Sequence, residues 1–284
     1  MKTYNDIYLE TRNALRASNI EGYTLEARLL VATAAGKTVS ELLRDINLYT
    51  TASIDAKVRE LTQRRLAGEP VAYITGAWEF YGLPMRVTPD VLIPRMDTEL
   101  LVSTAKELLL GRKMDARILD LCCGSGCIAC ALGHELPATK LVAVDISANA
   151  LEVARENFAA NRLGSRAICI QADATSSPPM SIGHFDMIVS NPPYIASREI
   201  ITLDPSVRDY EPIWALDGGE DGYRFYKAII KYWKSLLRPG GFLLFEVGEG
   251  QAATVKDMLS SAGFRAVGSR LDTLNIERVV IGKI

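Results

Sequence analysis

The chain has 284 residues, of which 48% are hydrophobic and 23% charged, values close to those of ordinary globular proteins. This composition excludes disorder as the main state, and it excludes collagen-like and disulfide-scaffold proteins. The length predicts one or two domains. Lys and Arg total 32 against 34 Asp and Glu, and the net charge of −2 disfavours, but does not exclude, a protein that binds along a nucleic-acid backbone.

The sequence shows no feature that directs a chain into or through a membrane. Its N-terminus, MKTYNDIYLE, lacks the apolar run of a signal peptide, and no run of about 18 apolar residues predicts a membrane span. Four of the five cysteines lie between residues 122 and 130, which suits reduced thiols better than a disulfide framework. We therefore expect a cytoplasmic protein without membrane contacts.

Residues 1–70 predict a small all-α helical-bundle domain. Apolar residues recur at helical spacing, no segment alternates like a strand, and Ser40 and Ser53 are candidate N-caps for two of the helices. Gly68 and Pro70 end the helical region. Residues 71–95 mix aromatic residues with Gly and Pro, and we expect a β-hairpin linker there, with strands near 79–81 and 85–87.

Residues 96–284 predict an α/β domain. A helix is expected from Thr98 through Leu110, and strands then alternate with helices. The expected strands span 117–121, 140–145, 166–171, 185–190 and 242–247, with helices at 127–136, 149–161 and 223–237. This rhythm is typical of a parallel sheet covered on both faces. The last two strands, 265–272 and 277–284, are joined by a short turn and must pair antiparallel.

A glycine-rich loop follows the first strand of this sheet. Asp120 lies near the end of the strand, and the loop Cys122–Gly126 leads into a helix whose first amides would face a ligand. Asp145 ends the next strand, where an acid can accept hydrogen bonds from both ribose hydroxyls. This loop has three interpretations: it binds a dinucleotide, it binds S-adenosylmethionine, or it binds no ligand at all. Asp120 favours the second, because a carboxylate would repel a pyrophosphate but attract the ammonium group of a methionine.

The tetrapeptide Asn191–Pro192–Pro193–Tyr194 follows the strand at 185–190, at the edge where open α/β sheets bind ligands. The Asn191 side-chain carbonyl accepts hydrogen bonds, the prolines leave nearby carbonyls free as acceptors, and Tyr194 offers a flat face. Such a set would hold a planar NH₂ group and aim its nitrogen at a methyl donor, and alignment can contribute roughly 7–11 kcal/mol. A Pro-rich turn that merely ends the strand is the alternative. The loop and the tetrapeptide together favour methyl transfer.

These motifs resemble the amino-methyltransferases with an Asn-Pro-Pro-Tyr motif, which include DNA adenine and protein glutamine methyltransferases. Four segments more specifically resemble the release-factor glutamine methyltransferases, the HemK/PrmC family: GEPVAYITGAWEFYGLPMRVTPDVLIPRMDTELL, YEPIWALDGGEDG, RPGGFLLFEVGEGQ and ERVVIG. A helical domain ahead of a Rossmann-like, class I methyltransferase sheet is also the arrangement of that family. The resemblance covers nearly the whole chain.

The resemblance implies methyl transfer from S-adenosylmethionine, with S-adenosylhomocysteine as product, to a side-chain amide nitrogen (N5). The acceptor is the glutamine of the Gly-Gly-Gln motif in peptide chain release factors, and its methylation modulates translation termination. Release factors would then be the partners, docked in part by domain 1–70, and we expect no stable nucleic-acid binding. Rival interpretations are a glutamine methyltransferase of a ribosomal protein, a DNA adenine-N6 methyltransferase, and a non-catalytic protein that binds adenosine cofactors.

The resemblance also assigns roles to individual residues. Cys122, Cys123, Gly124, Ser125 and Gly126 would line the methionine part of the cofactor, with Asp120 beside them and Asp145 at the ribose. Asp173 and Ala174 would lie near the adenine. The side chain of Asn191 and the Pro192 carbonyl would accept the two amide hydrogens of the substrate, and Asn191 would also border the cofactor. Pro193 would lie in the same turn, and Tyr194 would pack on the plane of the amide. Arg95, Thr98 and Glu99 match a family stretch that borders the pocket.

Three departures from the family pattern stand out. Cys122 and Cys123 replace the usual Gly-Thr, so we expect the backbone to lie slightly further from the cofactor. Met96 replaces a proline. Ala174 follows Asp173 where many members have Trp or Phe, so adenine stacking must come from elsewhere or be weaker.

Some residues could belong either to a functional site or to the protein interior. Cys127-x-x-Cys130 could bind zinc or carry out redox chemistry, but buried small residues are favoured, and no metal is expected. Two structural roles are open for Trp78, Phe80 and Tyr81: they form the core of the linker, or they form a wall of the pocket. Glu246 is either an acid in the pocket or a solvated residue at the end of a strand. No general base is expected, because the proton can leave the nitrogen after the methyl group arrives.

Overall fold

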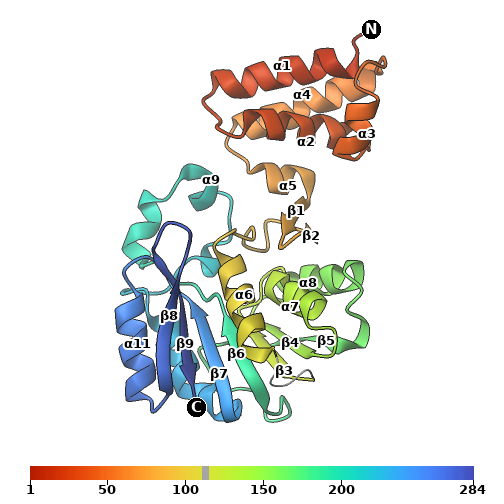
Figure 1. Cartoon of the computed structure of the whole chain (residues 1–284). Helices are drawn as coiled ribbons and strands as arrows, with labels where there is room; N and C mark the ends of the chain where they lie inside the picture. Colours follow the sequence, from red (N-terminus) through yellow and green to blue (C-terminus); the bar gives the residue numbers. More distant parts are fainter. Residues whose placement is uncertain (111–114) are drawn as a thin grey trace. The chain divides into compact units, whose positions relative to one another are not determined.

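The computed structural model describes residues 1–110 and 115–284 (Figure 1). The chain forms two compact units, Met1–Ala77 with Asp204–Tyr210, and Trp78–Leu203 with Glu211–Ile284. The helical unit thus extends to Ala77 rather than to residue 70, and it includes a later segment that the sequence did not indicate. Within the described ranges, no helix is both long enough and apolar enough to span a bilayer.

The first unit is built from helices around one apolar core. Its elements are α1 (Tyr4–Ala17), α2 (Tyr23–Ala35), α3 (Val39–Arg44), α4 (Ala52–Leu66), α5 (Val71–Thr75) and α9 (Pro205–Arg208). Ile7, Leu15, Leu30 and Leu61 are buried in the core, as their helical spacing requires. Val71 and Ile74 of α5 are buried there too, so the start of the segment expected as a linker belongs to the helical core.

The N-caps of α3 and α4 lie two residues before the serines that were expected to cap them. Thr38 accepts a hydrogen bond from the Glu41 amide at 3.2 Å, and its own amide donates to Glu41 Oε2 at 2.8 Å. This reciprocal pair is a capping box, which needs Thr and Glu three residues apart. Thr51 caps α4 by accepting from the Ile54 amide at 3.3 Å, without the reciprocal bond of a capping box.

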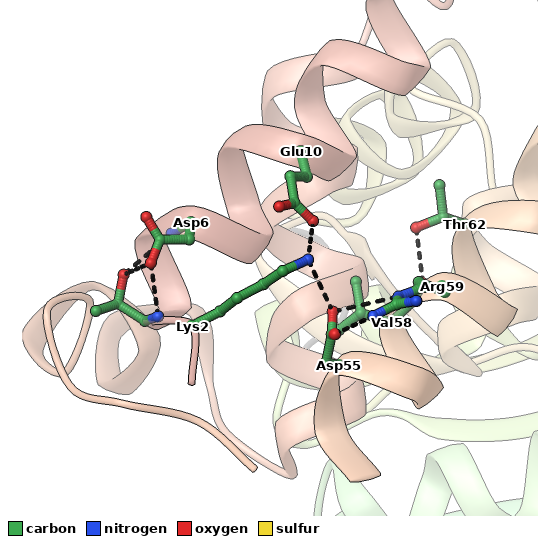
Figure 2. Close-up of polar contacts among 8 residues, drawn as sticks. Lys2, Asp6, Glu10, Asp55, Val58, Arg59 and Thr62 are labelled. Carbon is green, nitrogen blue, oxygen red and sulfur yellow. Dashed lines mark hydrogen bonds and ion pairs between the residues drawn. The ribbon is translucent and has the colours of Figure 1, made fainter. Parts of the chain in front are cut away.

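Polar contacts also join α1 to α4 (Figure 2). Lys2 pairs with Glu10 of α1, and its Nζ lies 3.6 Å from Asp55 Oδ1 of α4. Asp55 pairs in turn with Arg59, one helical turn further along α4. These side chains are partly exposed, so each pair contributes little, and the packed core holds the helices together.

The second unit contains a two-stranded sheet and a seven-stranded sheet. The strands are β1 (Ala77–Phe80), β2 (Leu83–Arg86), β3 (Arg117–Leu121), β4 (Lys140–Asp145), β5 (Ala167–Gln171), β6 (Phe185–Ser190), β7 (Leu237–Glu246), β8 (Arg265–Leu271) and β9 (Glu277–Lys283). The large sheet has the order β5-β4-β3-β6-β7-β9-β8. Strands β3 to β7 pair in parallel, and β9 is antiparallel to both of its neighbours. The predicted α/β class and the terminal hairpin are confirmed.

Helices cover both faces of this sheet (Figure 1). Successive residues along each strand point to opposite faces of the sheet. Because both faces are buried, these residues contribute alternately to two separate hydrophobic cores. Helices α6 (Thr98–Leu109), α7 (Cys127–Glu135) and α8 (Ala148–Ala160) share one core, which also takes up Phe80. Helices α10 (Arg224–Tyr232) and α11 (Ala252–Ser261) share the other. Helix α11 was not predicted, and α10 ends earlier than expected.

Candidate active site

The strand register brings four chemically distinct side chains to one edge of the sheet. Leu121 of β3 pairs with Val144 of β4 and with Ser190 of β6, and Ser190 pairs with Phe245 of β7. The next residues along these strands are Cys122, Asp145, Asn191 and Glu246, at the carboxyl ends of the strands. The chain leaves β3 towards β4 and β5 and later returns to β6 on the other side of β3, and such a switch point is where open α/β sheets bind ligands.

A cavity of about 380 Å³ opens at this edge. Its volume lies within the range of small-molecule sites. The expected site residues that line it are Cys122, Cys123, Ser125, Asp145, Asp173, Ala174, Asn191 and Pro193, together with Arg95 and Thr98. The structure therefore brings the glycine loop and the Asn-Pro-Pro-Tyr segment to a single cavity.

Other expected site residues do not line the cavity: Asp120, Gly124, Gly126, Pro192, Tyr194 and Glu99. Pro192 is buried. Glu99 turns to the β-hairpin, where it accepts a hydrogen bond from the Tyr81 amide at 2.8 Å. Phe80 lies in the hydrophobic core, and the Trp78 ring nitrogen donates to the Pro94 carbonyl at 3.0 Å. These aromatic residues therefore support the segment around Pro94 that lines the cavity, and they do not form the cavity wall themselves.

The glycine loop is held in place by specific contacts. Gly124 and Gly126 have φ values of 50° and 74°, in the left-handed region that favours glycine. A Cβ at Gly126 would lie 2.8 Å from the Phe158 ring, so that residue must be glycine for space as well. The Gly124 amide donates to Asp145 Oδ2 at 2.9 Å, and buried Asn157 donates to the Ser125 carbonyl at 2.9 Å.

Cys122 adopts a φ of 60° although it carries a side chain. A left-handed conformation costs an ordinary residue roughly 1–2 kcal/mol. The loop thus keeps the backbone geometry of a glycine at the position where the family pattern has one, and the cysteine bears the strain.

A buried acid, Asp120, and a partly buried acid, Asp145, flank the loop. Asp120 is fully buried, and its Oδ2 accepts from the Ala129 amide at 3.2 Å, while Oδ1 has no hydrogen-bond partner among the described residues. Burial raises the pKa of Asp120 to about 8, and the charge of Asp145 adds to the shift. Burial also raises the pKa of Asp145, whose Oδ1 accepts from the Ser147 amide at 2.9 Å.

Asn191 lies between the cavity and a second pair of polar groups. Its Nδ2 donates to Thr98 Oγ1 at 3.1 Å. Thr98 and Glu246 are each 2% exposed, so Glu246 is not a solvated strand end, and it does not line the cavity either. Burial raises the pKa of Glu246 to about 7, and hydrogen bonds with Thr98 and Asn191 act in the opposite direction.

Three glycines lie close to Tyr194, two against its backbone and one against its ring. A Cβ at Gly218 would lie 2.7 Å from Tyr194 Cα, and a Cβ at Gly222 would lie 2.5 Å from the Tyr194 carbonyl oxygen. A Cβ at Gly248 would lie 3.0 Å from the tyrosine ring. Gln251 Nε2 also donates to the Tyr194 carbonyl at 2.9 Å. These close approaches hold the segment Asn191–Tyr194, and burial raises the pKa of the Tyr194 hydroxyl to about 12.

Sequence reasoning missed part of the cavity wall. Ile146, Trp214 and Phe225 also line the cavity, and Trp214 is 52% exposed. Buried Glu211 joins two wall segments, because it pairs with Arg95 and accepts from the Ile93 amide at 3.2 Å. A signal existed for some of these residues, since Ile146 directly follows Asp145 and Trp214 lies in the YEPIWALDGGEDG segment.

The cysteine cluster consists of three buried cysteines, Cys123, Cys127 and Cys130, and the partly buried Cys122. Cys127 and Cys130 are buried on α7, and Cys127 also reaches the cavity, which was not expected. Burial raises the pKa of the thiols of Cys122, Cys123 and Cys127, so they are protonated and poor nucleophiles. In residues 1–110 and 115–284, no group of three or more His, Cys, Asp or Glu is arranged to hold a metal ion.

Comparison with known proteins adds independent information. Residues 6–76 match the model of the PrmC N-terminal domain, and residues 96–203 match that of the methyltransferase small domain. The release factor glutamine methyltransferase of Bradyrhizobium diazoefficiens is 42% identical over 87% of this chain and 83% of its own length. That of Geobacter sulfurreducens is 41% identical over 96% of this chain and 94% of its own length.

Solved structures agree on the fold. The hMettl16 catalytic domain, in complex with MAT2A 3'UTR hairpin 6, superposes with a TM-score of 0.59 at 18% identity, over 78% of this chain and 81% of that chain. A methyltransferase from Pyrococcus furiosus gives a TM-score of 0.51 at 17% identity, over 79% of this chain and 98% of that chain. At these identities the likeness shows the fold alone.

Proposed function

The chain belongs to the release factor glutamine methyltransferase family, and from that premise we propose that it methylates the side-chain amide nitrogen of the Gly-Gly-Gln glutamine in peptide chain release factors. The observation that carries this proposal is the position of Asn191. It directly follows β6 and lines the cavity that Asp145 also lines, so a hydrogen-bond acceptor for an amide NH₂ faces a site suited to a nucleoside.

The proposed methyl donor is S-adenosylmethionine, and two features of the cavity support it. Asp145 is placed for ribose hydroxyls, with acceptor capacity left after its two backbone hydrogen bonds. Asp120 itself is buried behind the cavity wall, and an ammonium group that reached its unpartnered Oδ1 would satisfy the orphan acceptor and favour the ionised carboxylate. Ile146, Phe225 and Trp214 supply apolar surface for the adenine in place of the aromatic residue that Ala174 lacks.

When bound, S-adenosylmethionine supplies an electrophilic methyl group on a positively charged sulfur. The protein then has to hold the amide nitrogen in line with that group, and alignment of this kind lowers barriers strongly. Asn191 Oδ1 and the Pro192 carbonyl would accept the two amide hydrogens, and the ring of Tyr194 would limit the amide to one plane. Because positive charge moves onto the nitrogen, acceptors at its hydrogens stabilise the transition state, and the surplus proton can leave to water.

Release factors are the proposed protein partners, and the helical unit of residues 1–77 is the proposed docking domain. The match of residues 6–76 to the N-terminal domain model of this family supports a role that is common to its members. A substrate from the translation machinery would place the enzyme in the cytoplasm.

The decisive experiment uses labelled S-adenosylmethionine with a purified release factor and with the same factor carrying Gln→Ala in its Gly-Gly-Gln motif. Label should enter the first protein only. Equal labelling of both factors, or of neither, would overturn the proposal. Duplex DNA and ribosomal proteins in parallel reactions test the two rival substrate classes.

Replacement of Asn191 tests the role of the residue itself. Asn191→Ala should abolish transfer and change cofactor affinity little, because the side chain aims the substrate nitrogen. The exposed Asn13 of α1 provides a matched control, and Asn13→Ala should transfer methyl groups at the wild-type rate. A loss of cofactor affinity as large as the loss of rate would contradict the aiming role.

A further inference from the structure

Glu246 is a buried acid that the proposed reaction leaves without a role. It ends β7 beside Asn191 of β6, because Ser190 and Phe245 are register partners and these two residues follow them. Its Oε2 has no hydrogen-bond partner in the part of the chain that the structure describes. A carboxylate that is 2% exposed and only partly satisfied is costly to keep, so its presence calls for an explanation.

Thr98 connects this carboxylate to Asn191. The Thr98 hydroxyl already accepts the proton of Asn191 Nδ2 at 3.1 Å, and a hydroxyl has a single proton of its own to donate. The carboxyl group of Glu246 has both Thr98 and Asn191 as hydrogen-bond partners. In its ionised form it accepts from both, since an ionised carboxylate is an acceptor only. Donation thus ends at the ionised Glu246, which takes protons from Thr98 and from Asn191, while Thr98 also accepts from Asn191.

The direction matters because the two ends of an asparagine amide have nearly the same shape. Only the hydrogen-bonding groups around it decide whether the oxygen or the NH₂ faces a given side. Acceptors on the protein side draw Nδ2 inwards and leave Oδ1 for the cavity. If Thr98 could donate to Asn191 Oδ1 instead, the amide would turn over and present NH₂ to the NH₂ of the substrate, two donors facing each other.

We propose that Glu246 is a positioning residue that acts on Asn191 directly and through Thr98 to keep the carbonyl oxygen of Asn191, rather than its NH₂, turned to the substrate. The proposal rests on the proposed function, because it assumes that the substrate group at Asn191 is an amide NH₂. Glu246 itself touches neither substrate nor cofactor. Its surroundings fit an anchored carboxylate, since Arg278 offsets the repulsion from Asp97, and the other titratable neighbours, Tyr194, Tyr226 and Cys127, are neutral.

Two pairs of variants separate positioning from mere packing. Glu246→Leu removes the acceptor, and Glu246→Gln keeps an acceptor oxygen for Thr98. Thr98→Val breaks the connection, and Thr98→Ser keeps the hydroxyl. By analogy with residues that orient metal ligands through hydrogen bonds, loss of a positioning residue is expected to cost about 10–100-fold. We expect Glu246→Leu and Thr98→Val to lose kcat by that factor at nearly unchanged cofactor Kd, and the conservative variants to recover most of it.

A matched control addresses stability. Thr139 is also fully buried, and its hydroxyl donates to the Leu136 carbonyl at 2.8 Å, outside the cavity wall. Thr139→Val should lower the midpoint of thermal unfolding and leave kcat unchanged. If Glu246→Leu keeps the wild-type kcat, or if Glu246→Gln loses as much kcat as Glu246→Leu, the positioning role is wrong.

A spectroscopic readout keeps this test independent of the substrate. The Asn191 side-chain NH₂ signals, assigned by their loss in Asn191→Ala, should shift in Glu246→Leu and return towards the wild-type position in Glu246→Gln. Unchanged signals in Glu246→Leu would overturn the positioning role even in an active enzyme. Failure of the wild-type enzyme to label any release factor would instead overturn the proposed function, and the amide spectra would still report the orientation.

Discussion

A Cβ atom at Gly218 would lie 2.7 Å from Cα of Tyr194 and 2.9 Å from the carbonyl oxygen of Pro193. Both neighbours are backbone atoms, which cannot rotate away as a flexible side chain can. The Gly-Gly-Glu-Asp-Gly segment and the Asn-Pro-Pro-Tyr segment are therefore in direct backbone contact. The glycine is required by this close approach, since its φ lies outside the left-handed region.

We expect Gly218→Ala to displace the Asn191–Tyr194 segment and to lower kcat by about 100-fold, because misplacement by roughly 1 Å can cost that much. Cofactor affinity should fall much less, since the glycine loop and Asp145 are on other strands. Steady-state kinetics and a binding titration check both parts. Gly268→Ala is the control, because a Cβ there meets nothing within 4 Å. Wild-type kinetics in Gly218→Ala would contradict the contact.

The sequence predicted the residues that end strands more reliably than those on irregular segments. Asp145 and Asn191 follow apolar runs of strand length, so their place at the sheet edge follows from the parallel topology. Trp214 lies in a segment without periodicity, and its approach to the cavity depends on backbone contacts such as that of Gly218. These contacts link residues far apart in the chain, and no local pattern encodes them.

The same contrast holds for the secondary structure. The strands over 140–145 and 185–190 were predicted to the residue, because each is an apolar run with clear ends. Strand β7 begins at Leu237, five residues before the expected start, and includes Pro239 and Gly240, which propensity excludes from strands. Helix α5 has only five residues and is stabilised by burial of Val71 and Ile74, a tertiary effect.

Cys122 offers a test of backbone strain. Because its φ is 60°, Cys122→Gly should be more stable than Cys122→Ala by about 1 kcal/mol. Comparison of the two variants cancels the loss of the thiol, which is common to both. Cys123 does not have a positive φ, so the order of stability should reverse at that position. Cys123→Ala should be more stable than Cys123→Gly by about 0.4–1 kcal/mol. Urea unfolding measures the four variants, and the same order at both positions would exclude strain at Cys122.

Glu246 should make the stability of the protein depend on pH. Its pKa of about 7 in the folded protein exceeds the 4.5 of an exposed glutamate, so the folded state binds the proton more tightly. The free energy of unfolding therefore declines as pH rises from about 4.5 to about 7, by about 3 kcal/mol for this group. Glu246→Gln removes the contribution, so the variant should gain stability relative to wild type across this window.

The measurement is the difference in unfolding free energy between wild type and Glu246→Gln from about pH 5 to pH 8. Other titrating groups, such as Asp120, affect both proteins alike and cancel in the difference. A difference that does not change with pH would show that Glu246 titrates as an exposed carboxylate does.

Asp120 should couple cofactor binding to proton release. Its pKa is about 8 in the free protein, so the carboxyl group is mostly protonated at pH 6.5. A cofactor ammonium beside Oδ1 favours the ionised form and lowers this pKa, so binding expels a proton. By linkage, the affinity for S-adenosylmethionine should then rise with pH between about 5 and 7, by up to tenfold per unit. Below pH 7 the ammonium group itself stays charged and adds no titration of its own.

Calorimetry in two buffers of different ionisation enthalpy counts the released protons directly. Near pH 6.5 we expect close to one proton per bound cofactor in the wild type and nearly none in Asp120→Asn, which cannot ionise. Asp145 also has a raised pKa, but its proposed ligand is an uncharged ribose, which leaves no reason for full ionisation on binding. Equal proton release from wild type and Asp120→Asn would show that the ammonium group does not bind at Asp120.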